Sequence, residues 1–225
     1  QSDNPEGELL YYISNRLDLQ CCIILSHSKK RITVVFRGSE SKHDWYYDFN
    51  ISKILLDNDI YVHSGFYKVL NCDETFNQIK EVILETLQQN PSYNVYLTGH
   101  SMGGALSTLC TYLLSKELNH IKFINYTYGA PRVGNNKFCW SINSLNCECW
   151  SIVNNRDLVT TVPSIGYCSL PNTILLKNSK MKVCVKPNYN NSWWYNTFLN
   201  MWNFCINLGI ADHSMDNYIA NITTY

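Results

Sequence analysis

The feature that most constrains this chain is the stretch YNVYLTGHSMGGALSTLCTYLL (residues 93–114), in which a serine has glycine two positions away on both sides. The apolar run before Gly99 predicts a strand, and the apolar positions after Ser101 recur at the spacing of a helix. So sharp a strand-to-helix turn strains the serine backbone, and a Cβ at Gly99 or Gly103 would collide with neighbouring chain. The stretch therefore predicts an elbow that holds the Ser101 hydroxyl out of a sheet.

Strands and helices alternate along the remaining chain. The sequence predicts strands at 20–27, 31–38, 93–99, 121–129 and 147–154, and helices at 64–89 and from Met102 onward. The first two strands are joined by the turn-like Ser28-Lys29-Lys30, which favours a hairpin. Because no internal repeat or linker interrupts this pattern, we expect one α/β domain over residues 1–225, with a mostly parallel central sheet flanked by helices.

A serine hydroxyl is a weak nucleophile unless a base takes its proton and an acid orients that base. In this architecture the order along the chain is Ser, then Asp or Glu, then His. Four of the six histidines precede Ser101 and a fifth follows it closely, which leaves His213 as the base. Asp157 follows a predicted strand and is favoured as the acid, since active-site groups gather at strand C-termini. Asp212 and Asp216 are the rivals.

Two backbone N–H groups are candidates for stabilising a developing oxyanion. One belongs to Met102, because the first N–H groups of a helix have no partner within it. The other belongs to Ser39 in VVFRGSES (34–41), where Gly38 permits close approach and the serine hydroxyl could add a third donor. Taken alone, that stretch also fits an ordinary strand-end turn, so both interpretations stay open.

Charge and composition exclude some partners. Eighteen basic and eighteen acidic residues cancel to a net charge of +0, and only 16% of residues are charged. The sequence has no basic groove for nucleic acid, whereas a sparsely charged surface is compatible with an uncharged substrate. The ten cysteines form no C-x-x-C pair, so we expect no metal site.

The compartment stays open, secreted or cytoplasmic. An even cysteine count permits disulfides in an oxidising compartment without showing them, and Cys110 is expected to be a small core residue. Of the four Asn-x-Ser/Thr sequons, the one at Asn125 falls in a predicted core strand. The chain begins at Gln1 with no signal-peptide pattern.

Residues 187–211 contain no charged side chain. Asparagines recur at helical spacing on one side, and large apolar residues, Trp202 among them, line another. The segment predicts an uncharged amphipathic helix, too interrupted by amides to span a bilayer. Two interpretations stay open: a helix packed on the core, or an aromatic wall for an acyl pocket or lipid surface near His213.

For two other histidines and three tyrosines we expect structural rather than catalytic roles. His63 is expected to cap or pack at the start of the helix at 64–89. His100 is expected to point to the opposite side of the elbow from the nucleophile. Tyr126, Tyr128 and Tyr218 are expected to be core aromatics.

Six stretches follow one another between residues 34 and 218: VVFRGSESKHDWYYDF, VHSGFY, LTGHSMGGALSTL, YTYGAPRVGN, NNRDLVTTVP and DHSMDNY. In this order they resemble the class 3 lipases, the family of the filamentous-fungal triacylglycerol lipases. The resemblance implies an α/β-hydrolase fold. It also implies that Ser101 is the nucleophile, Asp157 the acid and His213 the base of a catalytic triad.

The resemblance extends to the rim of the site. It implies that Ser39 and Met102 form the oxyanion hole, and that residues 41–47 form a short lid, with Trp45 near the lid tryptophan of some fungal members. The chain departs from the family in two ways. We expect N-terminal helical material to be shortened or missing, because fungal members are longer. The lid carries more charge than a simple apolar flap, which argues against strong interfacial activation.

We therefore expect a serine carboxylic-ester hydrolase, a lipase that cleaves acylglycerols through an acyl-enzyme and needs no metal or organic cofactor. The expected partners are a lipid or ester substrate and peripheral contact with a lipid interface, with no nucleic acid and no transmembrane segment. Related feruloyl esterases share the fold and triad. A feruloyl-type or phospholipid esterase therefore stays an alternative, as do an acyltransferase and a catalytically silent lipid-binding module.

Overall fold

The structure is a computed structural model that describes residues 7–38, 51–154, 157–177, 180–185 and 211–223. An eight-stranded sheet forms its centre, in the order β1-β2-β3-β6-β7-β8-β9-β10. The strands are β1 (Glu8–Ser14), β2 (Gln20–Ser26), β3 (Arg31–Phe36), β6 (Asn94–His100), β7 (Phe123–Tyr128), β8 (Cys147–Asn154), β9 (Asn172–Lys177) and β10 (Lys180–Val185). A separate hairpin consists of β4 (Lys53–Asp57) and β5 (Ile60–His63).

The middle of the sheet is parallel, as the sequence predicts. Neighbouring strands from β3 through β6, β7 and β8 to β9 pair in parallel registers. The edges are antiparallel, with β1 on β2, β2 on β3 and β10 on β9. The pairing of β2 with β3 confirms the predicted hairpin. Parallel neighbours need crossover connections, and a helix separates each of the pairs β3–β6, β6–β7 and β7–β8 in the chain.

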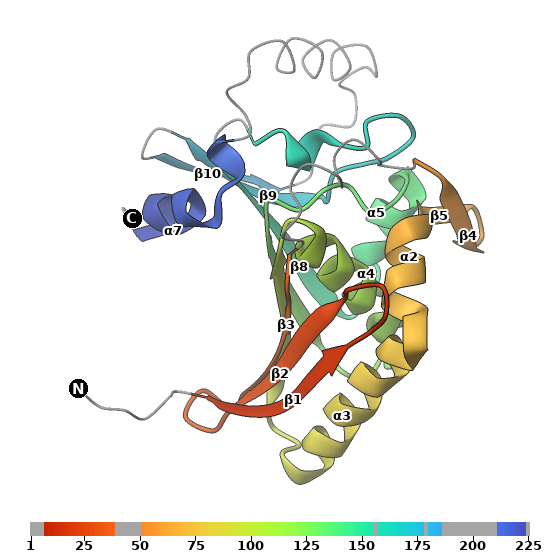
Figure 1. The fold of residues 1–225 in the computed structure, drawn as a ribbon, viewed down its shortest axis with the longest axis vertical. Coiled ribbons are helices and arrows are strands. Elements are labelled where there is room, and N and C mark those ends of the chain that lie inside the picture. Colours follow the sequence, from red (N-terminus) through yellow and green to blue (C-terminus); the bar gives the residue numbers. More distant parts are fainter. Residues whose placement is uncertain (1–6, 39–50, 155–156, 178–179, 186–210, 224–225) are drawn as a thin grey trace.

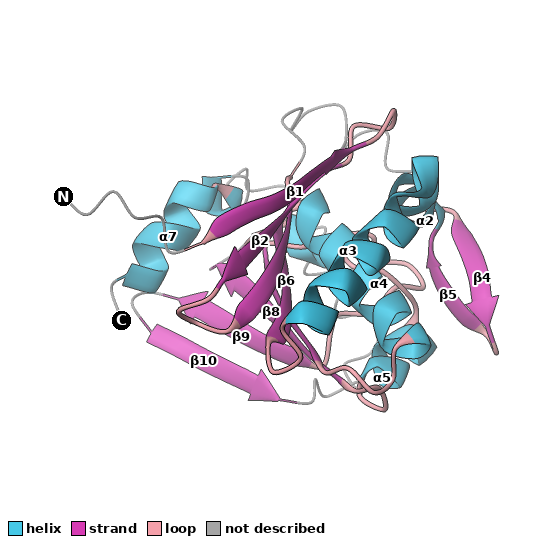
Figure 2. Ribbon diagram, turned by 90° about the horizontal axis from the view of Figure 1, so that it is seen from below, coloured by secondary structure: helices cyan, strands magenta, loops and turns pink. Residues whose placement is uncertain are grey.

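Helices cover both faces of this sheet. They are α2 (Ser64–Asn71), α3 (Thr75–Gln89), α4 (Met102–Glu117), α5 (Asn136–Ile142) and α7 (Met215–Thr223), with the short 3-10 turns η1 (Cys72–Glu74), η2 (Val159–Thr161) and η3 (Ala211–His213). Figure 1 shows α2, α3, α4 and α5 on one side of the sheet and α7 on the other, and Figure 2 shows the same division from below. The two faces are therefore covered unequally in the described part of the chain.

The single helix predicted at 64–89 is wrong, because η1 divides it into α2 and α3. Asp73 and Glu74 have left-handed φ angles of 52° and 58°. The Asp73 carboxylate accepts the backbone N–H of Arg16, and the Thr75 hydroxyl donates to the carbonyl of Cys72. Polar side chains that bond to nearby backbone in this way compete with the helix and end it. Because apolar residues recur at helical spacing on both sides of η1, the sequence did not show that the helix is interrupted there.

The helix that follows the elbow is the most deeply buried element of the fold. Most residues of α4 are buried, and it packs against β6 and β7. Cys110 on α4 is fully buried, which confirms its predicted place in the core. A helix packed against the sheet along most of its length has little freedom to tilt, so its N-terminus is a rigid support for the site.

Asn125 on β7 confirms that one sequon lies in the core. Its side chain is fully buried, accepts a hydrogen bond from Ser107 and donates one to Thr108.

Within the described ranges, none of the helices combines the length and apolar character needed to cross a membrane.

Candidate active site

Strand β6 turns into α4 at Ser101, as the glycine spacing predicts. Ser101 has φ 56° and ψ −128°, a strained conformation for a residue with a Cβ. Its N–H donates to the carbonyl of Tyr128 on β7 at 3.0 Å, which fixes the turn against the sheet. A Cβ on Gly99 would overlap the backbone of Gly103, and a Cβ on Gly103 would overlap the carbonyl of Phe36. The two glycines therefore let β3, β6 and α4 meet around the serine.

Three predicted side chains meet at this elbow. His213 Nε2 lies 2.8 Å from Ser101 Oγ, and His213 Nδ1 lies 2.9 Å from Asp157 Oδ2. Because a carboxylate accepts hydrogen bonds, Nδ1–H donates to Asp157, and the Nε2 lone pair faces the serine hydroxyl. His213 bonds to Asp157 rather than to its rivals Asp212 and Asp216. A continuous hydrogen-bonded chain thus joins segments far apart in the sequence.

The carboxylate of Asp157 is held by three donors. Its Oδ1 accepts the N–H of Val159 at 2.9 Å, while its Oδ2 accepts both His213 Nδ1 and the hydroxyl of Tyr218, the latter at 2.7 Å. Its backbone N–H donates to the carbonyl of Asn154, the last residue of β8, at 2.9 Å. The side chain is fully buried. These contacts fix the plane of the carboxylate toward the imidazole.

Tyr218 on α7 is a core residue, as predicted, but it also contacts the candidate triad. Its ring is fully buried, and its hydroxyl donates to Asp157 and accepts the N–H of Asn154 at 3.0 Å. Burial, followed by the charge of Asp157 and the hydrogen bond to it, raises the pKa of Tyr218 far above its ordinary value. The phenol therefore stays a donor across the working pH range. Sequence reasoning missed this contact, for which the only signal is proximity to His213.

Asn154 connects the segment that contains His213 to the sheet, and this contact was also not predicted from the sequence. Its Nδ2 donates to the carbonyl of Asp212 at 2.9 Å, and its Oδ1 accepts Nδ2 of Asn221 on α7 at 2.8 Å. One buried side chain at the end of β8 therefore holds the residue before His213 and the helix after it. This contact positions the imidazole relative to the strand that leads to Asp157.

Gly129, directly after β7, leaves room for the side chains of Asp157 and His213. Its φ of +59° is in the left-handed region, where a side chain is strained. A Cβ there would lie 2.7 Å from Asp157 Oδ2 and 3.0 Å from His213 Nδ1. Both the backbone conformation and the space therefore require glycine at this position.

His100 contacts His213, an interaction that the sequence did not predict. Its Nε2 lies 2.8 Å from the backbone carbonyl of His213, and the two rings lie 4.6 Å apart at 30°. Because a carbonyl accepts, His100 Nε2 carries the proton. Side chains alternate along β6, which places His100 on the sheet face that α7 covers. His63, by contrast, caps α2 as predicted, since its Nδ1 accepts the N–H groups of Gly65 and Phe66.

Part of the predicted oxyanion hole lies within the described residues. Met102 is the first residue of α4, so its N–H has no acceptor within the helix. A Cβ on Gly38 would lie 2.9 Å from the carbonyl of His100, so the chain after β3 runs beside the elbow. Outside the described residues lie Ser39, Trp45 and Trp202, the predicted lid, and residues 187–210 of the predicted amphipathic helix.

The mostly parallel sheet, the elbow after β6 and the hydrogen-bonded Asp157 after β8 define an α/β-hydrolase fold. A sequence model of the class 3 lipases matches residues 33–167, which is more than half of the chain. The chain belongs to the class 3 lipase family.

The chain is also similar to individual fungal lipases. It is 32% identical to the lipase of Rhizomucor miehei over 155 residues, which are 67% of this chain and 42% of that protein. It is 28% identical to secreted mono- and diacylglycerol lipase 1 of Fusarium solani, over 69% of this chain and 46% of that protein. The solved structure of lipase II from Rhizopus niveus matches with a TM-score of 0.81 at 26% identity, over 93% of this chain and 79% of that chain. The chain thus spans less than half the length of the first two relatives.

Proposed function

We propose that this chain is a serine carboxylic-ester hydrolase, a lipase that cleaves acylglycerols, with residues 1–225 acting as one hydrolase domain. The observation that carries the proposal is the hydrogen-bonded chain from Ser101 through His213 to Asp157. Such a chain supplies a nucleophile, a base and an acid that orients the base. The proposed reaction uses side chains and backbone groups of this chain alone.

In the proposed acylation step, His213 Nε2 takes the proton of Ser101 as Oγ attacks the ester carbonyl carbon. Asp157 keeps the Nδ1 proton in place and stabilises the imidazolium that forms. The imidazolium then gives its proton to the alcohol oxygen, the C–O bond breaks and the alcohol leaves. The acyl group remains on Ser101 as an ester. Water attacks that ester by the same route, and the free acid leaves.

The tetrahedral oxyanion needs donors that are already in position. The Met102 N–H at the start of α4 is one such donor, and the helix dipole there favours negative charge. We propose the N–H of Ser39 as the second donor. Its support is Gly38, whose close approach to the carbonyl of His100 brings this part of the chain to the elbow.

The proposed substrate class is an uncharged lipid ester. The relatives support it, since one is named a lipase and another a mono- and diacylglycerol lipase. The composition supports it as well, because only 16% of residues are charged. We also propose peripheral contact with a lipid interface, for which the uncharged, aromatic stretch at 187–211 is the sequence support.

A hydrolysis panel tests this function. The chain and its Ser101→Ala variant are assayed against p-nitrophenyl butyrate, emulsified triacylglycerol, monoacylglycerol, phospholipid and methyl ferulate. We expect acid release from the acylglycerols, and a loss of about ten-thousandfold or more in turnover in the variant. Ser144→Ala makes the same substitution at an exposed serine. It is the matched control and should keep full activity.

The panel also separates the alternatives. Activity on methyl ferulate or phospholipid with none on acylglycerols would replace the proposed substrate class. Transfer of the acyl group to an added alcohol, in preference to water, would replace hydrolysis by acyl transfer. Turnover that is equal in Ser101→Ala, or absent on every ester, would contradict the proposed enzyme.

A further inference from the structure

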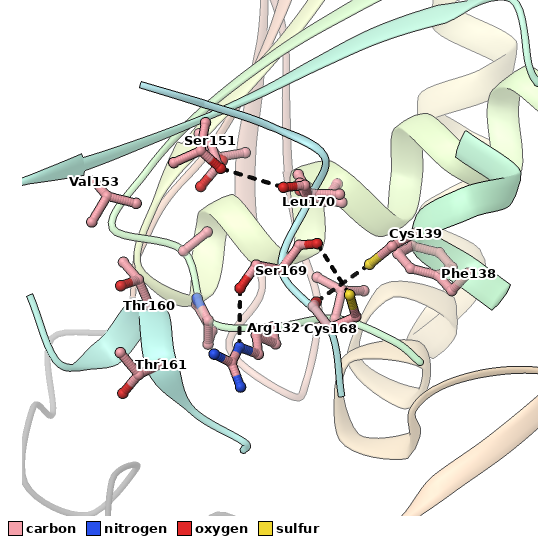
Figure 3. Close-up of a pocket in the computed structure, with 16 residues that line it drawn as sticks. Arg132, Phe138, Cys139, Ser151, Val153, Thr160, Thr161, Cys168, Ser169 and Leu170 are labelled. Atoms are coloured by element: carbon pink, nitrogen blue, oxygen red, sulfur yellow. Dashed lines mark hydrogen bonds between the residues drawn. The ribbon is translucent and has the colours of Figure 1, made fainter. Parts of the chain in front are cut away.

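A cavity of about 150 Å³ lies away from the candidate triad (Figure 3). Its walls come from the loop after β7, from α5 and from the chain that follows η2, and none of Ser101, Asp157 and His213 lines it. A cavity of about this volume holds a molecule the size of benzene. The space is therefore large enough for a ligand of roughly six non-hydrogen atoms.

One side chain gives this cavity a charge. Arg132, in the loop after β7, is mostly buried, and its Nε donates to Ser169 Oγ at 3.1 Å (Figure 3). Within the described ranges its two terminal nitrogens have no hydrogen-bond acceptor, and no carboxylate lies at ion-pair distance. Burial lowers the pKa of the Arg132 guanidinium from its ordinary value, but an arginine this basic stays charged. Its positive charge thus has no counter-charge among the residues that the structure describes.

The walls of the cavity supply no carboxylate for this arginine. The 16 residues that line the cavity include no Asp or Glu, and residues 158–211 contain none at all. The ionisable groups that act on the guanidinium are the thiols of Cys168 and Cys139. The hydrogen bond to Cys168 and burial raise the pKa of Cys139 well above its ordinary value, so that thiol stays neutral. A charge buried without a partner is costly, and a bound anion would offset that cost.

The remaining walls favour an anion with an apolar part. Phe138, Val153 and Leu170 line the cavity with carbon. The hydroxyls of Thr160 and Thr161 also line it, but they donate to the backbone carbonyls of Asp157 and Leu158. The guanidinium is therefore the principal donor, and its planar fork matches a carboxylate in two parallel hydrogen bonds.

We propose that the cavity at Arg132 is a binding site for a short-chain carboxylate. The two terminal nitrogens of the guanidinium bind the two carboxylate oxygens, and the alkyl chain packs against the apolar wall. Butyrate, with six non-hydrogen atoms, matches the volume. Short carboxylic acids are also the product class of short-chain ester hydrolysis, but the binding site does not depend on that activity.

Isothermal titration calorimetry of sodium butyrate into the Ser101→Ala chain tests the proposal without turnover. We expect saturable binding of one butyrate per chain, together with a rise in Tm that sodium chloride at equal ionic strength does not produce. Arg132→Gln should weaken the affinity at least tenfold. Arg16→Gln removes the same charge from an exposed ion pair with Asp73 and should leave the affinity unchanged.

Any one of the following outcomes would overturn the proposal. Heat and Tm that respond to butyrate no more than to chloride would remove the site. Equal affinity in Arg132→Gln would place the ligand elsewhere, and tighter binding of phosphate or sulfate would contradict the carboxylate class. If Arg132→Gln does not fold, the butyrate affinity of Arg132→Lys tests the proposal instead. It keeps the charge but loses the fork, so its affinity should fall several-fold, and unchanged affinity would exclude bidentate binding.

Discussion

Replacing Tyr218 by phenylalanine removes one oxygen atom that the structure places between α7, the end of β8 and the candidate acid. The phenol loses its hydrogen bond to the Asp157 carboxylate, and the N–H of Asn154 loses its acceptor. A hydrogen bond to a charged group contributes about 1.5–3 kcal/mol, and an unpaired buried N–H costs about 1–3 kcal/mol. Since both effects come from one hydroxyl, we expect the free energy of unfolding to fall by about 3 kcal/mol.

The assay is urea unfolding at pH 7, followed by tryptophan fluorescence and circular dichroism. For a domain of this size, 3 kcal/mol corresponds to a Tm lower by about 6–12 °C. Turnover per folded molecule should fall roughly 10- to 100-fold, because Val159 N–H and His213 still hold Asp157 but less firmly. That loss is smaller than the loss expected for removing a triad member.

Tyr128→Phe is the matched control. Tyr128, the last residue of β7, packs edge-on against the Tyr218 ring with the ring centres 6.3 Å apart, and its hydroxyl makes no hydrogen bond within the described residues. Its substitution should change the free energy of unfolding by less than about 0.5 kcal/mol. Equal effects of the two substitutions, or a Tyr218→Phe variant as stable and active as the unchanged chain, would refute the assigned contact.

Three further predictions follow from the same geometry. Gly129→Ala should lower stability by about 1–3 kcal/mol and also reduce turnover, because its Cβ meets Asp157 and His213. Gly166→Ala, also at positive φ but facing only the flexible tip of Lys53, should change stability alone, so equal turnover in both variants would contradict this. Asp157→Asn should cut turnover about ten-thousandfold while the chain still folds, measured with a soluble ester, and a loss under tenfold would remove Asp157 as the acid. The raised pKa of Tyr218 gives stability that is constant below about pH 9 and is lost as the pH rises through 10, since the unfolded phenol then ionises and the buried one does not. Denaturant titrations should show that the free energy of unfolding falls by about 1.4 kcal/mol more between pH 9 and pH 11 than in Tyr218→Phe, and equal losses in the two proteins would refute this.

The elbow could be predicted from the sequence because its causes are local. A strand, a helix and two glycines around Ser101 lie within one short stretch, and a Cβ on Gly99 would meet Gly103 in that same stretch. The clash that Gly103 avoids is with Phe36 on β3, which the stretch alone does not show. Met102 follows from the same stretch. His213 and Asp157 were chosen by their order along the chain, and the structure brings both to Ser101.

The rest of the site depends on contacts that no local pattern records. Tyr218 and Asn154 are ordinary residues in their own segments, and they reach Asp157 and Asp212 only because α7 crosses the end of β8. The contact of His100 with His213 was not predicted because the sheet face that α7 covers is known only from the packed structure. The edge strand β1 and the β9–β10 hairpin were not predicted, since their outward side chains weaken the apolar pattern.

The most direct test of the central claim is the rate at which a fluorophosphonate probe labels Ser101, followed by mass spectrometry in the unchanged chain and in His213→Ala. We expect one label per chain at Ser101, and labelling at least a thousandfold slower without the imidazole. Labelling at another residue, or the same rate in both proteins, would contradict a serine activated by His213.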